Sequence, residues 1–135
     1  MIGIVVVTHA GLADELIQAT QLILGPLKRV ESLSIGREMS LDTAKEKLHQ
    51  VIAQVGKDGD GIIILTDLFG GTPTNISAEL LQEGVVEILT GVNLPMLIKG
   101  VGSRMNQNLD GLVTLLKEYG KNAIIRPSEL LRSTR

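Results

Sequence analysis

Two reactive side chains, a histidine and an aspartate, follow apolar runs of the chain. His9 comes after the run Ile4–Val7 and a single threonine, and Asp67 comes directly after the run Gly61–Thr66. An imidazole titrates near neutrality when unperturbed, so it can serve as a nucleophile or an acid–base group without a large environmental shift. A carboxylate beside the ring would fix its tautomer, leave the other nitrogen free to attack phosphorus, and stabilise the positive ring that forms. The pair therefore predicts nucleophilic or acid–base chemistry at His9.

A short glycine-rich segment follows the aspartate. Gly70 and Gly71 carry no Cβ atoms just before an expected helix, so backbone N–H groups can approach an anion at the positive end of the helix dipole. Thr72 adds a hydroxyl donor. The same residues also fit an ordinary turn, with Thr72 as the N-cap and Pro73 at the first helical position. Taken alone, this segment supports either interpretation.

The pattern around these residues is an alternation of short β-branched runs and longer amphipathic segments, typical of βαβ units with a mainly parallel sheet. We expect strands at residues 1–7, 30–35, 61–66, 85–90 and 122–126, and helices at 12–24, 41–55, 72–81 and 109–119, with Gly120 ending the last helix. A further helix after residue 95 would be interrupted by Gly100 and Gly102, in a mobile or kinked segment.

Ligands of open parallel sheets bind beyond the carboxyl ends of the strands. Three segments qualify, at residues 8–11, 67–72 and 91–95. Each reactive residue alone also fits a structural role, His9 as a polar strand end and Asp67 as a helix-start cap. Their matching places at the tips of what should be neighbouring strands favour a functional site.

The composition excludes several classes of protein. The chain has 135 residues, of which 44% are hydrophobic and 1% aromatic, and it has a net charge of −2 and no cysteine. This fits one aliphatic domain and argues against nucleic-acid binding, disulfides and cysteine-based metal centres. Walker and Gly-x-Gly-x-x-Gly motifs are absent. We expect no metal or cofactor, a surface position for the second histidine, His49, and a cytoplasmic location, since no targeting or membrane-spanning segment is recognisable.

Three motifs carry a resemblance to a known family: Val-Val-Thr-His9-Ala-Gly, Thr-Asp67-Leu-Phe-Gly-Gly-Thr72-Pro-Thr-Asn75, and Gly91-Val-Asn-Leu-Pro-Met-Leu97. The chain resembles the EIIA component of the mannose-type (mannose/fructose/sorbose) sugar phosphotransferase system. The resemblance implies a three-layer α/β sandwich with strand order 2-1-3-4. Residues 1–126 would form a single phosphocarrier domain and residues 127–135 a polar tail.

The resemblance also implies roles for the residues singled out above. His9 would accept a phosphoryl group from the carrier protein HPr and pass it to a histidine of an EIIB protein. Asp67 would hold the unreactive ring nitrogen, while Gly70, Gly71 and Thr72 would bind the phosphoryl oxygens. No metal or nucleotide takes part in such an exchange.

The assembly implied by the resemblance is a homodimer in which the antiparallel strand at residues 122–126 pairs with the sheet of the other subunit. No EIIB domain follows Arg135, so the EIIB would be a separate protein. Membrane contact would be indirect, through EIIC and EIID components.

Departures from the family pattern keep other functions open. Phe69 stands where many members have tryptophan. A regulatory carrier, whose phosphorylation state is read by a partner protein, remains an alternative, as does a phosphoryl donor to a dihydroxyacetone kinase. A dimeric anion-binding module using only the glycine segment is a fourth hypothesis. The sugar, if one is transported, is not visible in this sequence.

Overall fold

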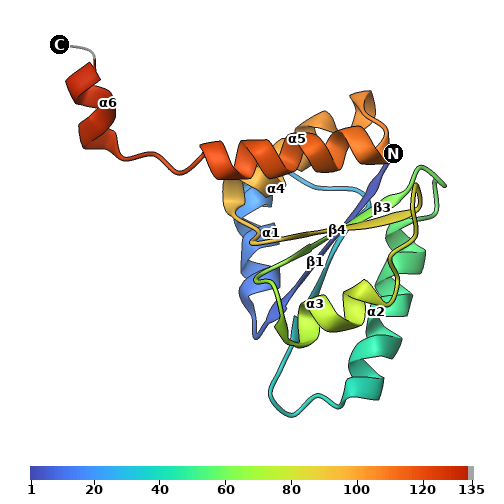
Figure 1. Ribbon diagram of the computed structural model, residues 1–135. Helices are drawn as coiled ribbons and strands as arrows, with labels where there is room; N and C mark the ends of the chain where they lie inside the picture. Colours follow the sequence, from blue (N-terminus) through green and yellow to red (C-terminus); the bar gives the residue numbers. More distant parts are fainter. Residues whose placement is uncertain (134–135) are drawn as a thin grey trace.

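A four-stranded parallel sheet forms the centre of the computed structural model, which describes residues 1–133 (Figure 1). Its strands are β1 (Gly3–His9), β2 (Val30–Ile35), β3 (Ile62–Thr66) and β4 (Val86–Thr90), in the order β2-β1-β3-β4. The two central strands, β1 and β3, are buried along their whole length apart from His9. Their uninterrupted apolar sequences fit strands that are covered on both faces. The predicted fold class and strand order are therefore confirmed.

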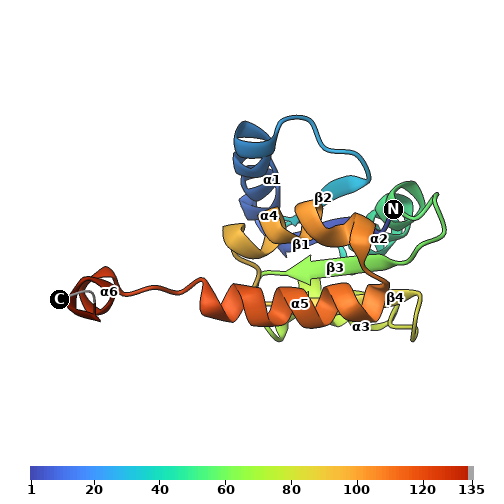
Figure 2. The same ribbon diagram turned by 90° about the horizontal axis from the view of Figure 1, so that it is seen from above.

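Helices cover both faces of the sheet (Figures 1 and 2). They are α1 (Leu12–Leu24), α2 (Leu41–Val55), α3 (Gly71–Ala78), α4 (Leu94–Ser103), the 3₁₀ helix η1 (Arg104–Asn106), α5 (Leu109–Asn122) and α6 (Pro127–Ser133). Side chains of β1 alternate between the two faces. Ile4 and Val6 pack with α1, α4 and α5, whereas Val5 and Val7 pack with α2 and α3.

The C-terminal part of the chain differs from the sequence prediction. Helix α5 continues through Gly120 to Asn122. A Cβ atom on Gly120 would lie 2.7 Å from the Cε atom of Met96, so this glycine permits close packing of α5 on α4 and does not end the helix. The predicted strand at residues 122–126 is therefore wrong for the single chain, because its first residue is helical and residues 123–126 form no strand.

The segment after α5 extends away from the sheet of its own chain (Figure 1). Ile124 is 81% exposed and Ile125 is 59% exposed. The expected polar tail begins with the short helix α6, and its last residues, Thr134 and Arg135, lie outside the described part of the chain. Pairing of this segment with a second subunit stays a prediction, since a strand completed only by another chain has no partner here.

Helix α4 is continuous through both of its glycines, so the predicted interruption is wrong. A Cβ atom on Gly100 would lie 3.1 Å from the Cδ1 atom of Leu116. The missing side chain therefore lets α4 approach α5 closely. At Gly102 nothing lies within 4 Å of such a Cβ, and the structure does not explain this glycine.

The strand register aligns the reactive residues at one edge of the sheet. Val7 of β1 pairs with Thr66 of β3, and His9 pairs with Ile35, the last residue of β2. His9 thus lies two residues after Val7, and Asp67 lies one residue after Thr66, the partner of Val7 in the sheet. The sheet delivers both side chains to its carboxyl edge, as the sequence predicted.

Candidate active site

His9 and Asp67 are in direct contact. The Oδ2 atom of Asp67 lies 2.8 Å from the ring Nδ1 atom of His9 and accepts a hydrogen bond of 2.9 Å from the backbone N–H of the same residue. The imidazole is 50% exposed, whereas the carboxylate is only 11% exposed. The carboxylate beside Nδ1 is thus mostly buried, whereas half of the imidazole is open to solvent.

The carboxylate of Asp67 is held in its charged form. Partial burial raises the pKa of this group, but the hydrogen bonds from the backbone and ring of His9 lower it more, and the net pKa is below its ordinary value of 3.8. The backbone N–H of Leu68 donates to the other carboxylate oxygen at 3.1 Å. A charged carboxylate is an acceptor only. In the neutral imidazole the ring proton therefore resides on Nδ1, which leaves the lone pair on Nε2.

The start of α3 lies against the reactive side of the ring. Gly70 and Gly71 have φ angles of +92° and +76°, which glycine adopts without steric cost. A Cβ atom on Gly71 would lie 3.0 Å from the Cε1 atom of His9 and 3.2 Å from Nε2. The backbone of α3 can approach the ring this closely only because residue 71 is glycine. Nε2 consequently faces the positive end of a helix dipole.

The helix starts two residues earlier than predicted, because its N-cap is Gly70 and not Thr72. Helix α3 begins at Gly71 with Gly70 as its N-cap, so Thr72 is its second residue and not its N-cap. The positive φ of Gly71 allows the chain to turn into the helix early. Thr72 is half-buried and lines the same pocket as His9.

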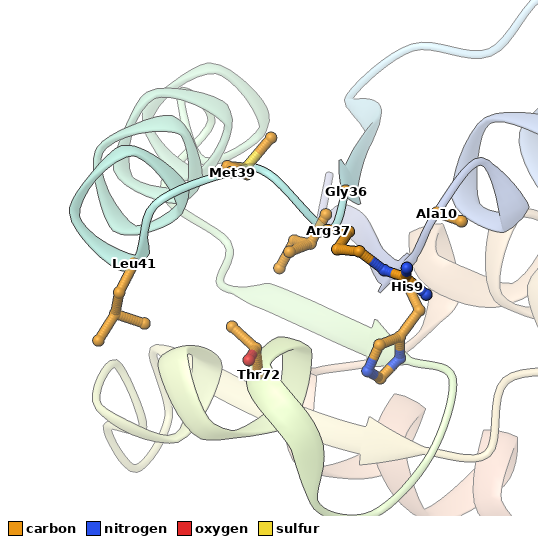
Figure 3. A pocket seen from close by; sticks show the side chains of 8 residues that line it. His9, Ala10, Gly36, Arg37, Met39, Leu41 and Thr72 are labelled. Atoms are coloured by element: carbon orange, nitrogen blue, oxygen red, sulfur yellow. The ribbon is translucent and has the colours of Figure 1, made fainter.

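An open pocket of about 690 Å³ surrounds the exposed ring (Figure 3). Its lining comes from the end of β1, the loop between β2 and α2, and the start of α3: His9, Ala10, Ile35, Gly36, Arg37, Met39, Leu41 and Thr72. Sequence reasoning missed Arg37. The signal was present, because Gly36-Arg37 directly follows the second predicted strand and hence lies at the same sheet edge.

Two buried threonines fix the loop between β3 and α3. The hydroxyl of Thr74 donates to the carbonyl of Leu68 at 2.6 Å, and its oxygen lies 2.8 Å from the hydroxyl of Thr66. Both threonines are buried. This network positions the segment that carries Asp67, and no spacing rule in the sequence pointed to it.

The third predicted segment, residues 91–95, does not reach this pocket. The side chain of Asn93 caps α4 by accepting from the N–H of Met96 at 2.9 Å, and it donates to the carbonyl of Gly120 at 3.1 Å. The segment therefore anchors α4 on α5. His49 lies exposed on α2 and is not among the pocket residues.

Within residues 1–133, no group of three or more His, Cys, Asp and Glu side chains is arranged to hold a metal ion. Nor is any helix of this part of the chain long and apolar enough to cross a membrane.

Known proteins share this sequence pattern and fold. The "PTS system mannose-specific EIIAB component" of Escherichia coli (strain K12) is 28% identical over 91% of this chain, and the chain spans 38% of the length of that protein. The "PTS system sorbose-specific EIIA component" of Lacticaseibacillus casei is 32% identical, with 84% of this chain and 81% of that protein covered. A crystal structure of phosphotransferase system component EIIA from Streptococcus agalactiae has a TM-score of 0.86 and 30% identity, with 96% and 99% of the two chains covered.

A family model described as "PTS system fructose IIA component" matches residues 3–117. This range contains the whole sheet and every element that contributes to the His9 pocket. The chain therefore belongs to the EIIA-man family of sugar phosphotransferase system components.

Proposed function

We propose that this chain is a phosphohistidine carrier in sugar uptake, with His9 as the residue that carries the phosphoryl group. The observation that supports this most directly is the 2.8 Å contact between Nδ1 of His9 and Asp67. It leaves Nε2 with a free lone pair beside the start of α3. Nucleophile, orienting carboxylate and anion-binding backbone are thus gathered around one imidazole ring.

In the proposed reaction the lone pair of Nε2 attacks the phosphorus of phosphorylated HPr. The new bond from Nε2 to phosphorus forms as the bond from phosphorus to the donor histidine breaks, and the donor imidazole leaves with its electron pair. The proton on Nδ1 of His9 stays in place, so the phosphorylated ring becomes positively charged. Asp67 stabilises this charge across the hydrogen bond, while the N–H groups of Gly71 and Thr72 and the Thr72 hydroxyl bind the phosphoryl oxygens.

The reverse chemistry delivers the group to a histidine of an EIIB protein. We propose that this exchange takes place in the cytoplasm and that EIIC and EIID components provide the only link to the membrane. No nucleotide or metal enters the scheme. The pocket fits this use because it is open and half of the ring is exposed, so the ring can meet a histidine on another protein surface.

The test is phosphorylation by Enzyme I, HPr and phosphoenolpyruvate, read by intact mass. The chain should gain one phosphoryl group. His9→Gln should gain none, whereas the matched control His49→Gln, at the second exposed histidine, should be phosphorylated like the unmodified chain. Lack of any gain on the unmodified chain, or an undiminished gain in His9→Gln, would refute the proposal.

A second assay identifies the acceptor. The phosphorylated chain is mixed with a purified EIIB protein or with the subunits of a dihydroxyacetone kinase, and loss of the phosphoryl group is followed by mass. We expect transfer to EIIB. Transfer to the kinase alone would assign the chain to that pathway, and transfer to neither would favour a regulatory output.

We also propose a homodimer formed by the segment after α5. Within residues 1–133, strand β4 is an edge strand of the sheet: it pairs along its length with β3, and its first residue, Val86, also forms an isolated bridge with Gln82. Ile124 and Ile125 are exposed. Pairing this segment with β4 of a second chain would cover both the exposed edge of β4 and the two isoleucines. Sedimentation equilibrium should give a dimer for the full chain and a monomer for Ile124→Asp, with Leu22→Asp, at another exposed apolar side chain, as the control. A monomeric full chain would contradict the proposal.

A further inference from the structure

A cation borders the His9 pocket from a loop that the mechanism above does not use. Arg37 lies between β2 and α2 and lines the pocket together with His9 and Thr72 (Figure 3). It is the only Lys or Arg among the lining residues. From this arrangement, and on the basis of the proposed carrier function, we infer that Arg37 is a phosphoryl-binding residue that completes the anion site around Nε2 of His9.

The strand register brings Arg37 next to the reactive histidine. Ile35 is the direct neighbour of His9 across the pair β1 and β2, and its carbonyl accepts from the N–H of Ala10 at 2.9 Å. Neighbouring strands lie about 4.8 Å apart. Arg37 is only two residues beyond Ile35, so its long side chain can span the distance to a group bound on the His9 ring.

Arg37 is an exposed residue of a tight turn. The N–H of Met39 donates to the carbonyl of Gly36 at 3.2 Å, which closes a four-residue turn with Arg37 at its second position. In Figure 3 the Arg37 side chain runs from this turn toward His9. The turn thus holds the base of the side chain while its guanidinium remains free to adjust to a ligand.

The phosphorylated site would carry excess negative charge, which a guanidinium can neutralise. After phosphorylation, the phosphoryl oxygens carry up to two negative charges and Asp67 carries one. The imidazole supplies a single positive charge. The start of α3 offers partial positive charge only on its own side of the ring. Within residues 1–133 Arg37 makes no ion pair that would have to break first. A planar fork of N–H donors also matches two phosphoryl oxygens.

The test uses the isolated phosphoprotein, so that it does not depend on any protein partner. A His49→Gln background limits chemical phosphorylation by phosphoramidate to His9, and ³¹P NMR follows the second ionisation of the phosphoryl group. A nearby cation favours the dianion. Arg37→Gln should therefore raise the second pKa of the phosphoryl group. We expect a rise of about half a unit to one unit, because solvent screens the interaction between exposed charges. Arg37→Lys should restore part of the shift, and the control Lys47→Gln, at an exposed lysine outside the pocket, should leave it unchanged.

A second readout is the equilibrium constant for phosphoryl exchange between this chain and HPr. Loss of the cation should shift this equilibrium toward phosphorylated HPr by about three- to tenfold in Arg37→Gln. Identical ³¹P titrations for Arg37→Gln and Lys47→Gln would overturn the inference, and a change confined to the KM for HPr would instead make Arg37 a docking residue. A ³¹P signal that responds to Arg37 together with no uptake from HPr would refute the carrier function and leave the inference intact.

Discussion

The Oδ2 atom of Asp67 accepts two hydrogen bonds from one residue, His9, at 2.9 Å from its backbone nitrogen and 2.8 Å from its ring nitrogen. The hydrogen bond from the backbone N–H fixes the position of the His9 backbone, and the hydrogen bond from Nδ1 fixes the orientation of the ring. Tautomer and orientation of the nucleophile are therefore set by a single oxygen atom at the tip of the neighbouring strand. This contact also determines what a change at Asp67 should do.

Asp67→Asn should slow phosphoryl uptake by about 10- to 100-fold or more while the fold is retained. The amide can still accept one bond from His9, but it no longer stabilises the positive ring formed on phosphorylation. Uptake from phosphorylated HPr is measured by quenched flow, and thermal unfolding serves as the control for folding. A rate equal to that of the unmodified chain would remove the orienting role of Asp67.

The same carboxylate should make the stability of the protein depend on pH. Its pKa is lower in the folded chain than its ordinary value of 3.8, so the unfolded chain binds the proton more readily. The resulting stabilisation is complete above the unfolded pKa and is lost as the pH falls through the folded pKa. The free energy of unfolding, measured in urea, should differ between the unmodified chain and Asp67→Asn by a constant amount above about pH 5 and by less below about pH 4. A difference that grows on acidification would contradict the assignment.

The site could be predicted from sequence as far as it depends on strand ends. His9 and Asp67 each follow an uninterrupted apolar run, and such runs fix which residues reach the carboxyl edge of a parallel sheet. Arg37 was missed even though β2 was predicted with its observed bounds. No motif includes this residue, and only the pairing of Ile35 with His9 places its loop at the pocket. The third candidate segment, at residues 91–95, also follows a strand end, but it caps α4 and does not line the pocket. A strand-end position alone does not say whether the following loop turns toward the pocket or caps a helix.

The helix glycines were misinterpreted for a different physical reason. Gly100 and Gly120 were treated as breaks, yet both are packing positions at which a side chain would meet Leu116 or Met96. Such contacts join elements that are distant in sequence, so local propensity cannot reveal them.

Thr74→Val should destabilise the protein by about 1–3 kcal/mol, because it leaves the carbonyl of Leu68 and the hydroxyl of Thr66 without their buried partner. Thr74→Ser keeps the hydroxyl and is the matched control for this loss. Urea unfolding of the three proteins tests the idea. If Thr74→Val were as stable as the unmodified chain, the hydrogen bonds of the Thr74 hydroxyl would not stabilise the fold.

Gly102→Ala should stabilise the protein by about 0.5–1 kcal/mol, since alanine is favoured over glycine inside a helix and nothing lies within 4 Å of the new methyl group. Gly100→Ala is the internal comparison. Its methyl group would lie 3.1 Å from Leu116, so most of the gain should be cancelled. Thermal denaturation distinguishes the two, and an equal gain at both positions would contradict the packing explanation for Gly100.

Gly71→Ala should reduce phosphoryl uptake by about tenfold or more, because its Cβ atom would lie 3.2 Å from Nε2 of His9 and would displace the ring or block the attacking atom. Gly84→Ala is a matched control: Gly84 has the same φ of +76°, and nothing lies within 4 Å of its Cβ position. Both variants should lose about 1–2 kcal/mol of stability through left-handed backbone strain, but only Gly71→Ala should lose activity. Equal uptake by the two variants would show that a methyl group at residue 71 does not disturb the reactive nitrogen, and would contradict the close approach of α3 to the ring.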